Sequence, residues 1–148
     1  MRTTDELLSC YYQSWLGLDA VYEKWAARRG VTSNVLNILI LLHEQAAPIP
    51  QAELCRCLHL SKQTVASVID SLEKRGIAAR RVSEGDRRSR VVMLTGTGDE
   101  AARKLSEALR QFERRALSML TPAQQQALVD TTQKLCQSME QALAQEME

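Results

Sequence analysis

The hydrophobic residues of this chain recur mostly at intervals of three and four, which is the period of an amphipathic helix. From residue 5 to residue 29 the recurring residues are aliphatic or aromatic, acidic residues occupy the first turn, and Gly30 follows the last turn. The run Val35–Leu42 is apolar on nearly every side, as a helix enclosed by others would be, and Thr32 or Ser33 can cap it. These two segments therefore predict a long amphipathic helix followed by a buried helix.

The next two segments are shorter and are separated by a turn. Residues 51–58 place two leucines four apart, and Ser61 is a suitable N-cap for the segment that follows. That segment, residues 62–75, carries one apolar stripe and is followed by Gly76, a residue type that often ends a helix. Together the two segments predict a helix-turn-helix.

The pattern then changes to short apolar stretches at residues 77–82 and 90–94, around a polar tip at residues 83–89. This arrangement predicts a β-hairpin. Residues 46–50 and the hairpin tip are the only stretches that look like loops.

Two further helices complete the chain. Gly96 and Gly98 are expected to break the chain between the hairpin and a fifth, long helix, whose apolar residues run from Leu105 to Leu120. Thr121 and the proline after it end that helix and cap a sixth.

These elements predict a mainly α fold with a small β-hairpin wing. We expect a helix-turn-helix with its hairpin as a wing, flanked by N- and C-terminal dimerisation helices, residues 1–30 and 99–148, in a single domain spanning residues 1–148. The long terminal helices cannot all pack on so small a core. A second copy of the chain is the simplest cover for their apolar stripes, because homo-oligomers are mostly two-fold dimers. We therefore expect a homodimer formed through the termini.

Composition excludes several classes of protein. The chain has 148 residues, of which 45% are hydrophobic and 25% charged, as in an ordered globular domain. No run approaches the roughly 20 apolar residues of a membrane-spanning helix, and the first residues lack a signal core. Four irregularly spaced cysteines do not suggest a disulfide framework. We expect a cytoplasmic protein with reduced thiols and no membrane association.

The net charge of +1 hides an uneven distribution along the chain. Residues 56–90 contain nine basic and four acidic residues, a net charge of +5, and the remaining residues carry −4. Positive charge gathered on a helix-turn-helix and its hairpin is typical of a surface that binds nucleic acid.

The first turns of the second helix in a helix-turn-helix point at base edges in the major groove. Glutamine pairs with adenine, lysine with guanine, and hydroxyl groups with bases or phosphates. Ser61 has a second role open to it, as the helix cap alone. The candidate DNA-binding residues of this helix are Ser61, Lys62, Gln63, Thr64 and Ser67.

The hairpin offers a second set of candidates. An arginine on a projecting loop can enter a narrow minor groove, and Arg88 is the residue that we expect to do so. Asp86 repels phosphate, so it is interpreted as holding a neighbouring arginine, or alternatively as a plain turn former. The full set in the hairpin is Arg80, Arg81, Asp86, Arg87, Arg88 and Arg90.

The first helix carries two features that suit regulation. Tyr11, Tyr12 and Trp15 could line a pocket for a small aromatic ligand, but packing in a dimer core is the favoured interpretation. Cys10 lies near a helix start, where the helix dipole lowers a thiol's pKa, so it is a candidate redox sensor for an oxidant; alternatively it is a small packed residue.

Nothing in the sequence suggests catalysis. No nucleophile with an adjacent base, metal-ligand spacing or phosphate-binding glycine loop is visible, so we expect no enzyme activity, no cofactor and no metal. A winged-helix protein-interaction module that does not bind an operator is the alternative function, because fold does not settle function.

Three segments, Leu58–Val65, Ile69–Gly76 and Asp86–Thr95, resemble the MarR family of bacterial transcription regulators. The resemblance is specific from about residue 32 to residue 98, and it extends to the flanking helices in length and pattern. It implies a MarR-like winged helix-turn-helix over residues 32–98, in a homodimer on a pseudo-palindromic operator, usually a repressor that a small molecule or an oxidant releases. It also implies that the family's wing motif falls on Asp86 and Arg88.

Overall fold

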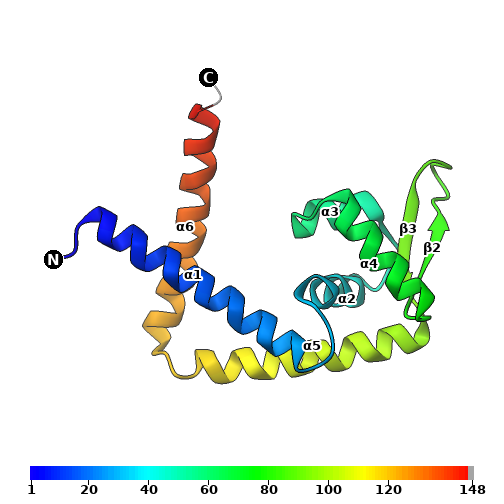
Figure 1. Ribbon diagram of the computed structural model, residues 1–148, viewed down its shortest axis with the longest axis horizontal. Coiled ribbons are helices and arrows are strands. Elements are labelled where there is room, and N and C mark those ends of the chain that lie inside the picture. The colour runs from blue at the N-terminus through cyan, green and yellow to red at the C-terminus, as the bar shows by residue number, and fades with distance from the viewer. Residues whose placement is uncertain (147–148) are drawn as a thin grey trace. The chain divides into compact units, whose positions relative to one another are not determined.

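The computed structural model describes residues 1–146, which form six helices and three short strands (Figure 1). The chain forms two compact units, Met1–Ser106 and Glu107–Glu148. The elements, in chain order, are α1 (Thr4–Ala27), α2 (Ser33–Gln45), β1 (Ile49–Pro50), α3 (Gln51–Leu58), α4 (Lys62–Lys74), β2 (Ala78–Val82), β3 (Arg90–Leu94), α5 (Gly96–Leu117) and α6 (Pro122–Glu146).

Side-chain caps begin the helices where the sequence predicted them. The Thr32 side chain accepts the Val35 backbone N–H at 3.2 Å at the start of α2, and Ser61 does the same for Thr64 at 3.1 Å at the start of α4. Gly76, with φ of +70°, follows the end of α4. The mainly α, winged helix-turn-helix architecture is confirmed.

The first unit has one hydrophobic core beneath the helix-turn-helix. Residues of α2, α3 and α4 supply most of it, and β1, β2, β3 and the start of α5 add one residue each. In the inward stripe of α4, Val65, Ile69 and Leu72 are fully buried, so the opposite face of this helix is left free to bind. The buried members of the cluster are Ile38, Leu39, Leu42, Ile49, Leu54, Val65, Ile69, Leu72, Ala78, Val92 and Ala102.

The sheet has three strands in the order β1-β3-β2, one more than the sequence predicted. Residues 46–50 were expected to be a loop, but Ile49 pairs with Val92 and Pro50 with Val91, antiparallel. The reason is long-range: Ile49 is 6% exposed and gains its place in the core only by pairing with a strand about forty residues away. Two prolines around a single isoleucine give no local signal for such a strand.

The two glycines before the fifth helix also behave differently from expectation. Gly96 and Gly98 lie inside the first turn of α5 and do not break the chain ahead of it. At Gly98 the reason is space, since an added Cβ atom would stand 1.8 Å from the carbonyl oxygen of Ile77. The glycine therefore lets α5 begin in contact with the base of the hairpin.

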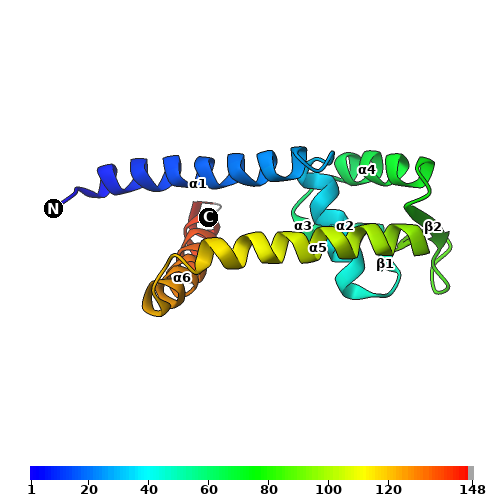
Figure 2. The same cartoon turned by 90° about the horizontal axis from the view of Figure 1, so that it is seen from below.

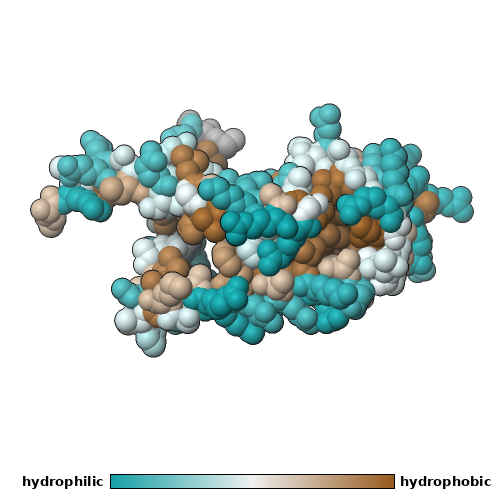
Figure 3. Space-filling view, turned by 60° about the horizontal axis from the view of Figure 1, so that its bottom comes forward, coloured by the Kyte–Doolittle hydropathy of each residue, from teal (hydrophilic) through white to brown (hydrophobic). Residues whose placement is uncertain are grey.

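The terminal helices expose much of their apolar surface. In α1 only Trp25 and Ala26 are buried, and α6 has no buried residue in its described length. Figure 3 shows hydrophobic residues at the surface on the face that it presents. The exposed large residues of these two helices are Leu7, Leu8, Tyr11, Tyr12, Trp15, Leu16, Leu18, Val21, Tyr22, Leu128, Val129, Met139 and Leu143.

Candidate nucleic-acid interface

The N-terminal turns of α4 present polar side chains to solvent. Lys62, Gln63 and Ser67 are exposed, as the sequence predicted. Thr64 is half-buried, and its hydroxyl lies 2.8 Å from that of Ser61, so these two side chains complete the cap of the helix. Capping by Ser61 is thus confirmed, and three neighbouring side chains remain free for other contacts.

The same face of α4 continues further than the sequence analysis proposed. A shallow hollow follows the exposed side of the helix, and most of the residues that line it are polar or charged. They lie three, four or seven positions apart, the spacing of one helix face, which is the signal that could have found them. The lining residues that the sequence analysis missed are Asp70, Ser71, Lys74 and Arg75, beside Gln63, Ala66 and Ser67.

The hairpin of β2 and β3 lies at the same end of the first unit as α4 (Figure 2). Its tip, residues 83–89, is closed by a bond from the Ser83 N–H to the Ser89 carbonyl oxygen at 3.0 Å. The Asp86 carboxylate accepts the backbone N–H of Arg88 at 2.9 Å, which is the turn-forming role. The remaining exposed basic side chains of the hairpin are Arg81, Arg87, Arg88 and Arg90.

Arg80 differs from the other arginines of the hairpin because it is bonded inside the protein. Its Nη1 lies 2.5 Å from Asp70 Oδ1 and 2.6 Å from Glu73 Oε1. Its Nε donates to Gln51 Oε1 at 3.0 Å, and its Nη2 to the carbonyl oxygen of Ala66 at 3.1 Å. The Arg80 backbone N–H also donates to Glu73 Oε2 at 3.1 Å.

These bonds set the electrostatics of Arg80. Partial burial by itself would lower the pKa of the Arg80 guanidinium, but the bonds with Asp70 and Glu73 outweigh burial and raise that pKa above its usual value. Only 20% of the side chain is exposed. The positive charge of Arg80 is therefore directed at two carboxylates of α4 and not at solvent.

Arg56 contributes less positive charge to this surface than the sequence count suggested. It forms an ion pair with Glu53 one turn earlier in α3, with Nε 3.0 Å from Oε2. The hydrogen bond from Arg56, with a smaller one from Cys57, lowers the pKa of Glu53 to about 2. Glu53 therefore stays ionised at neutral pH and offsets the charge of Arg56.

The candidate regulatory residues all lie on α1, away from the helix-turn-helix in sequence. Cys10, Tyr11, Tyr12 and Trp15 are exposed, and the rings of Tyr12 and Trp15 stack with centroids 6.3 Å apart. The exposed thiol of Cys10 is open to an oxidant.

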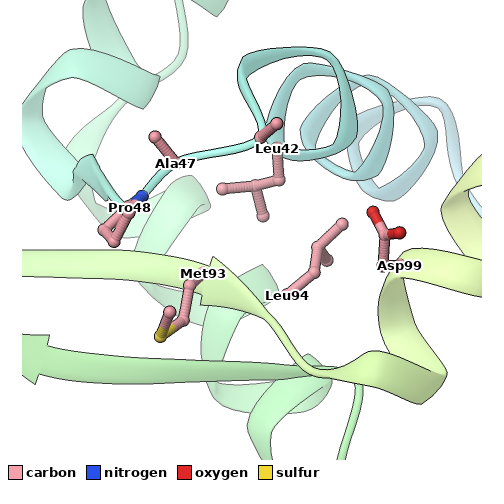
Figure 4. A pocket seen from close by; sticks show the side chains of 7 residues that line it. Leu42, Ala47, Pro48, Met93, Leu94 and Asp99 are labelled. Carbon is pink, nitrogen blue, oxygen red and sulfur yellow. The ribbon is translucent and has the colours of Figure 1, made fainter.

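A cavity of about 250 Å³ lies between the end of α2, the segment before β1, and β3 (Figure 4). The side chains that line it are apolar except for the Asp99 carboxylate, which lies 2.7 Å from His43 Nδ1. Sequence reasoning missed this cavity, because it forms where α2, β3 and α5 meet. Its lining residues are Leu42, Ala46, Ala47, Pro48, Met93, Leu94 and Asp99.

The described residues contain neither a metal-binding cluster nor a membrane-spanning helix. Within residues 1–146, no three His, Cys, Asp or Glu residues are grouped so that they could hold a metal ion. None of the helices in that range is long and apolar enough to cross a membrane.

Comparison with known proteins gives a match to a family model and to two curated transcriptional regulators. A family model described as MarR family matches residues 29–89. The HTH-type transcriptional regulator YfiV of Bacillus subtilis is 30% identical over 107 residues, which is 72% of this chain and 66% of that protein. The transcriptional repressor MprA of Escherichia coli is 29% identical over 119 residues, 80% of this chain and 68% of that protein. The chain thus spans about two thirds of the length of these curated relatives.

The fold also matches solved structures. The MepR–DNA complex of S. aureus superposes with a TM-score of 0.76 at 17% sequence identity, over 93% of this chain and 99% of that one. At this identity the likeness concerns the fold.

Proposed function

Because this chain belongs to the MarR family of winged-helix regulators, we propose that it binds DNA sequence-specifically and regulates transcription. The observation that carries the proposal is the surface of α4. Its inner stripe is buried in the core, while Lys62, Gln63 and Ser67 are exposed at its N-terminal end beside a hairpin with exposed arginines. This is the arrangement with which a winged helix-turn-helix engages a duplex.

The chemistry of each side chain suits it to a different part of the duplex. Gln63 suits adenine and Lys62 suits guanine, whereas Ser67 suits either a base or a phosphate. On the hairpin, Arg88 suits the minor groove, and its backbone is held by Asp86. Arg81, Arg87 and Arg90 supply phosphate contacts, and Ser61 and Thr64 fix the start of α4.

The proposal includes a homodimer. The apolar residues exposed along α1 and α6 amount to more than a monomer ordinarily leaves in water, and a second copy of the same helices would cover them. A two-fold dimer places two copies of α4 on successive turns of the duplex, so the operator is expected to be pseudo-palindromic. Tyr11, Tyr12 and Trp15 then lie in or beside this dimer interface.

The proposal also covers the sign and control of regulation. The relative MprA is called a repressor, and we propose repression here, with release by a small molecule or an oxidant. The cavity beside β3 and the aromatic cluster of α1 are the two candidate places for a ligand, and Cys10 is the candidate for oxidation. Because a regulator reaches its operator only where the DNA is, the proposal also assigns the protein to the cytoplasm.

The test is an affinity measurement on DNA selected by the protein itself. Duplexes recovered from a randomised library are titrated with the purified protein at several salt concentrations. Phosphate contacts predict that the logarithm of affinity falls with the logarithm of salt by about 0.9 for each neutralised phosphate, so five contacts give a slope of about −4 to −5. A flat salt response, or no enriched sequence, contradicts DNA binding and favours a protein-interaction module.

A further inference from the structure

We propose that Arg80 is a positioning residue that fixes the hairpin against α4, and that operator selectivity depends on it although it contacts no DNA. This inference rests on the proposed function, because it concerns how the two DNA-binding elements are held relative to each other. It assigns Arg80 a role different from the direct contact that its sequence position suggested.

The first argument is a count of donors. A guanidinium has five N–H groups, and a phosphate is held best by two neighbouring ones in a fork. In Arg80 the Nε donor is used by Gln51, the two Nη1 donors by Asp70 and Glu73, and one Nη2 donor by Ala66. One N–H remains, which is too few for a forked phosphate contact.

The second argument is the direction that the strand gives to the side chain. Arg80 pairs with Val92 on β3, and Val92 pairs with Ile49 on β1, so these three residues form one row across the sheet. Side chains directly opposite one another point to the same face. Because Val92 and Ile49 are core residues, the row faces inward and Arg80 is directed at α4.

The third argument is what the bonds connect. Arg80 lies on β2, Gln51 begins α3, and the remaining three partners lie on consecutive turns of α4. One side chain thus joins the wing to both helices of the helix-turn-helix. Removing it would leave two carboxylates of α4 without their shared cation, and it would remove the side-chain bonds that hold the wing against α4.

The experiment compares four variants with the wild type. Each protein is titrated with the duplex recovered by selection and with a scrambled duplex of equal composition, over a range of salt concentrations. Arg80→Lys keeps the charge but loses the multiple bonds, and Arg80→Met loses both. Glu73→Gln removes the negative charge and one of the two acceptor oxygens at residue 73. Arg81→Met removes the neighbouring arginine, which is exposed and points to the other face of the strand.

The positioning role predicts a change in selectivity without a change in phosphate contacts. Arg80→Lys and Glu73→Gln should each lower the ratio of selected to scrambled affinity by about tenfold or more, the size of a misplaced base contact. The salt slope should stay at the wild-type value in both, whereas Arg81→Met should reduce it by about 0.9 for each protomer. In the free protein, Glu73→Gln should also speed hydrogen exchange at the Arg80 amide, because that N–H donates to Glu73.

Three results would overturn the inference. A salt slope reduced by about 0.9 per protomer in Arg80→Met, with equal losses on both duplexes, would make Arg80 a phosphate contact. Stronger binding of Glu73→Gln to both duplexes would show that only local charge matters. An unchanged selectivity ratio in Arg80→Lys would show that the bonds are not needed. If the wild type binds neither duplex, the proposed function itself fails, so its failure can be told apart from failure of the positioning role. If Arg80→Met does not fold, Arg80→Lys and Glu73→Gln still test the positioning role.

Discussion

Replacing Gly98 with alanine should destabilise the protein, because there is no room for a methyl group at this position. The new Cβ atom would stand 1.8 Å from the carbonyl oxygen of Ile77 and 2.8 Å from its carbonyl carbon. Both are backbone atoms, and they are held in place: the Ile77 carbonyl accepts the Thr95 N–H at 3.0 Å, and the Ile77 N–H donates to Leu72 at 2.9 Å. Since carbon–oxygen contacts begin near roughly 3.3 Å, the start of α5 must move by about 1.5 Å.

The size of the stability loss in Gly98→Ala follows from two opposing effects. In a helix, alanine is favoured over glycine by about 0.5–1 kcal/mol. Overpacking typically costs about 1–3 kcal/mol, and a clash with fixed backbone belongs at the upper end of that range. The net loss for Gly98→Ala is therefore about 2 kcal/mol, which corresponds to a fall in Tm of about 4–8 °C for a chain of this size.

Gly96→Ala is the matched control, two residues earlier in the same helix turn. Nothing lies within 4 Å of a Cβ atom built at Gly96, so this variant gains the helix preference without a clash and should be at least as stable as the wild type. Urea unfolding followed by circular dichroism, at one fixed protein concentration, measures both. Equal stability of the two variants would refute the close packing of α5 against the base of the hairpin.

Other predictions concern the individual parts of the proposed mechanism. Arg88→Ala should weaken binding to the selected duplex by about 1–3 kcal/mol with an unchanged unfolding midpoint, and unchanged affinity would remove Arg88 from the interface. Trp15→Glu places a charge on the exposed apolar face of α1 and should shift the sedimentation profile toward monomer; an intact dimer would exclude this face from the interface. Cys10→Ser should retain DNA binding and lose release by peroxide, whereas release that persists in this variant excludes Cys10 as the sensor.

The parts of the fold that depend on residues close together in the sequence were predictable from the sequence. The caps at Thr32 and Ser61 follow from residue type, and the buried stripe of α4 from the helical period. The strand β1 was not predictable in the same way, because Ile49 pairs with Val92 far along the chain. The close approach at Gly98 likewise depends on where Ile77 comes to lie.

The candidate interface was likewise predictable from the sequence only in part. Exposed side chains at the start of α4 were identified from their type and position, as was the arginine-rich hairpin tip. Arg80 was counted with the exposed arginines because composition does not show which face of a strand a residue occupies. Its alternation with the buried Ala78 indicates the inward face, but the bonds to Asp70 and Glu73 exist only because β2 returns alongside α4.

The central claim, that α4 and the hairpin form a DNA-binding surface, is tested most directly by hydrogen exchange with and without the selected duplex. The account predicts slower amide exchange at residues 61–67 and 83–90 when the duplex is bound, with little change in the first half of α1. Binding that leaves both of these segments unchanged, or that protects only other parts of the chain, would contradict it.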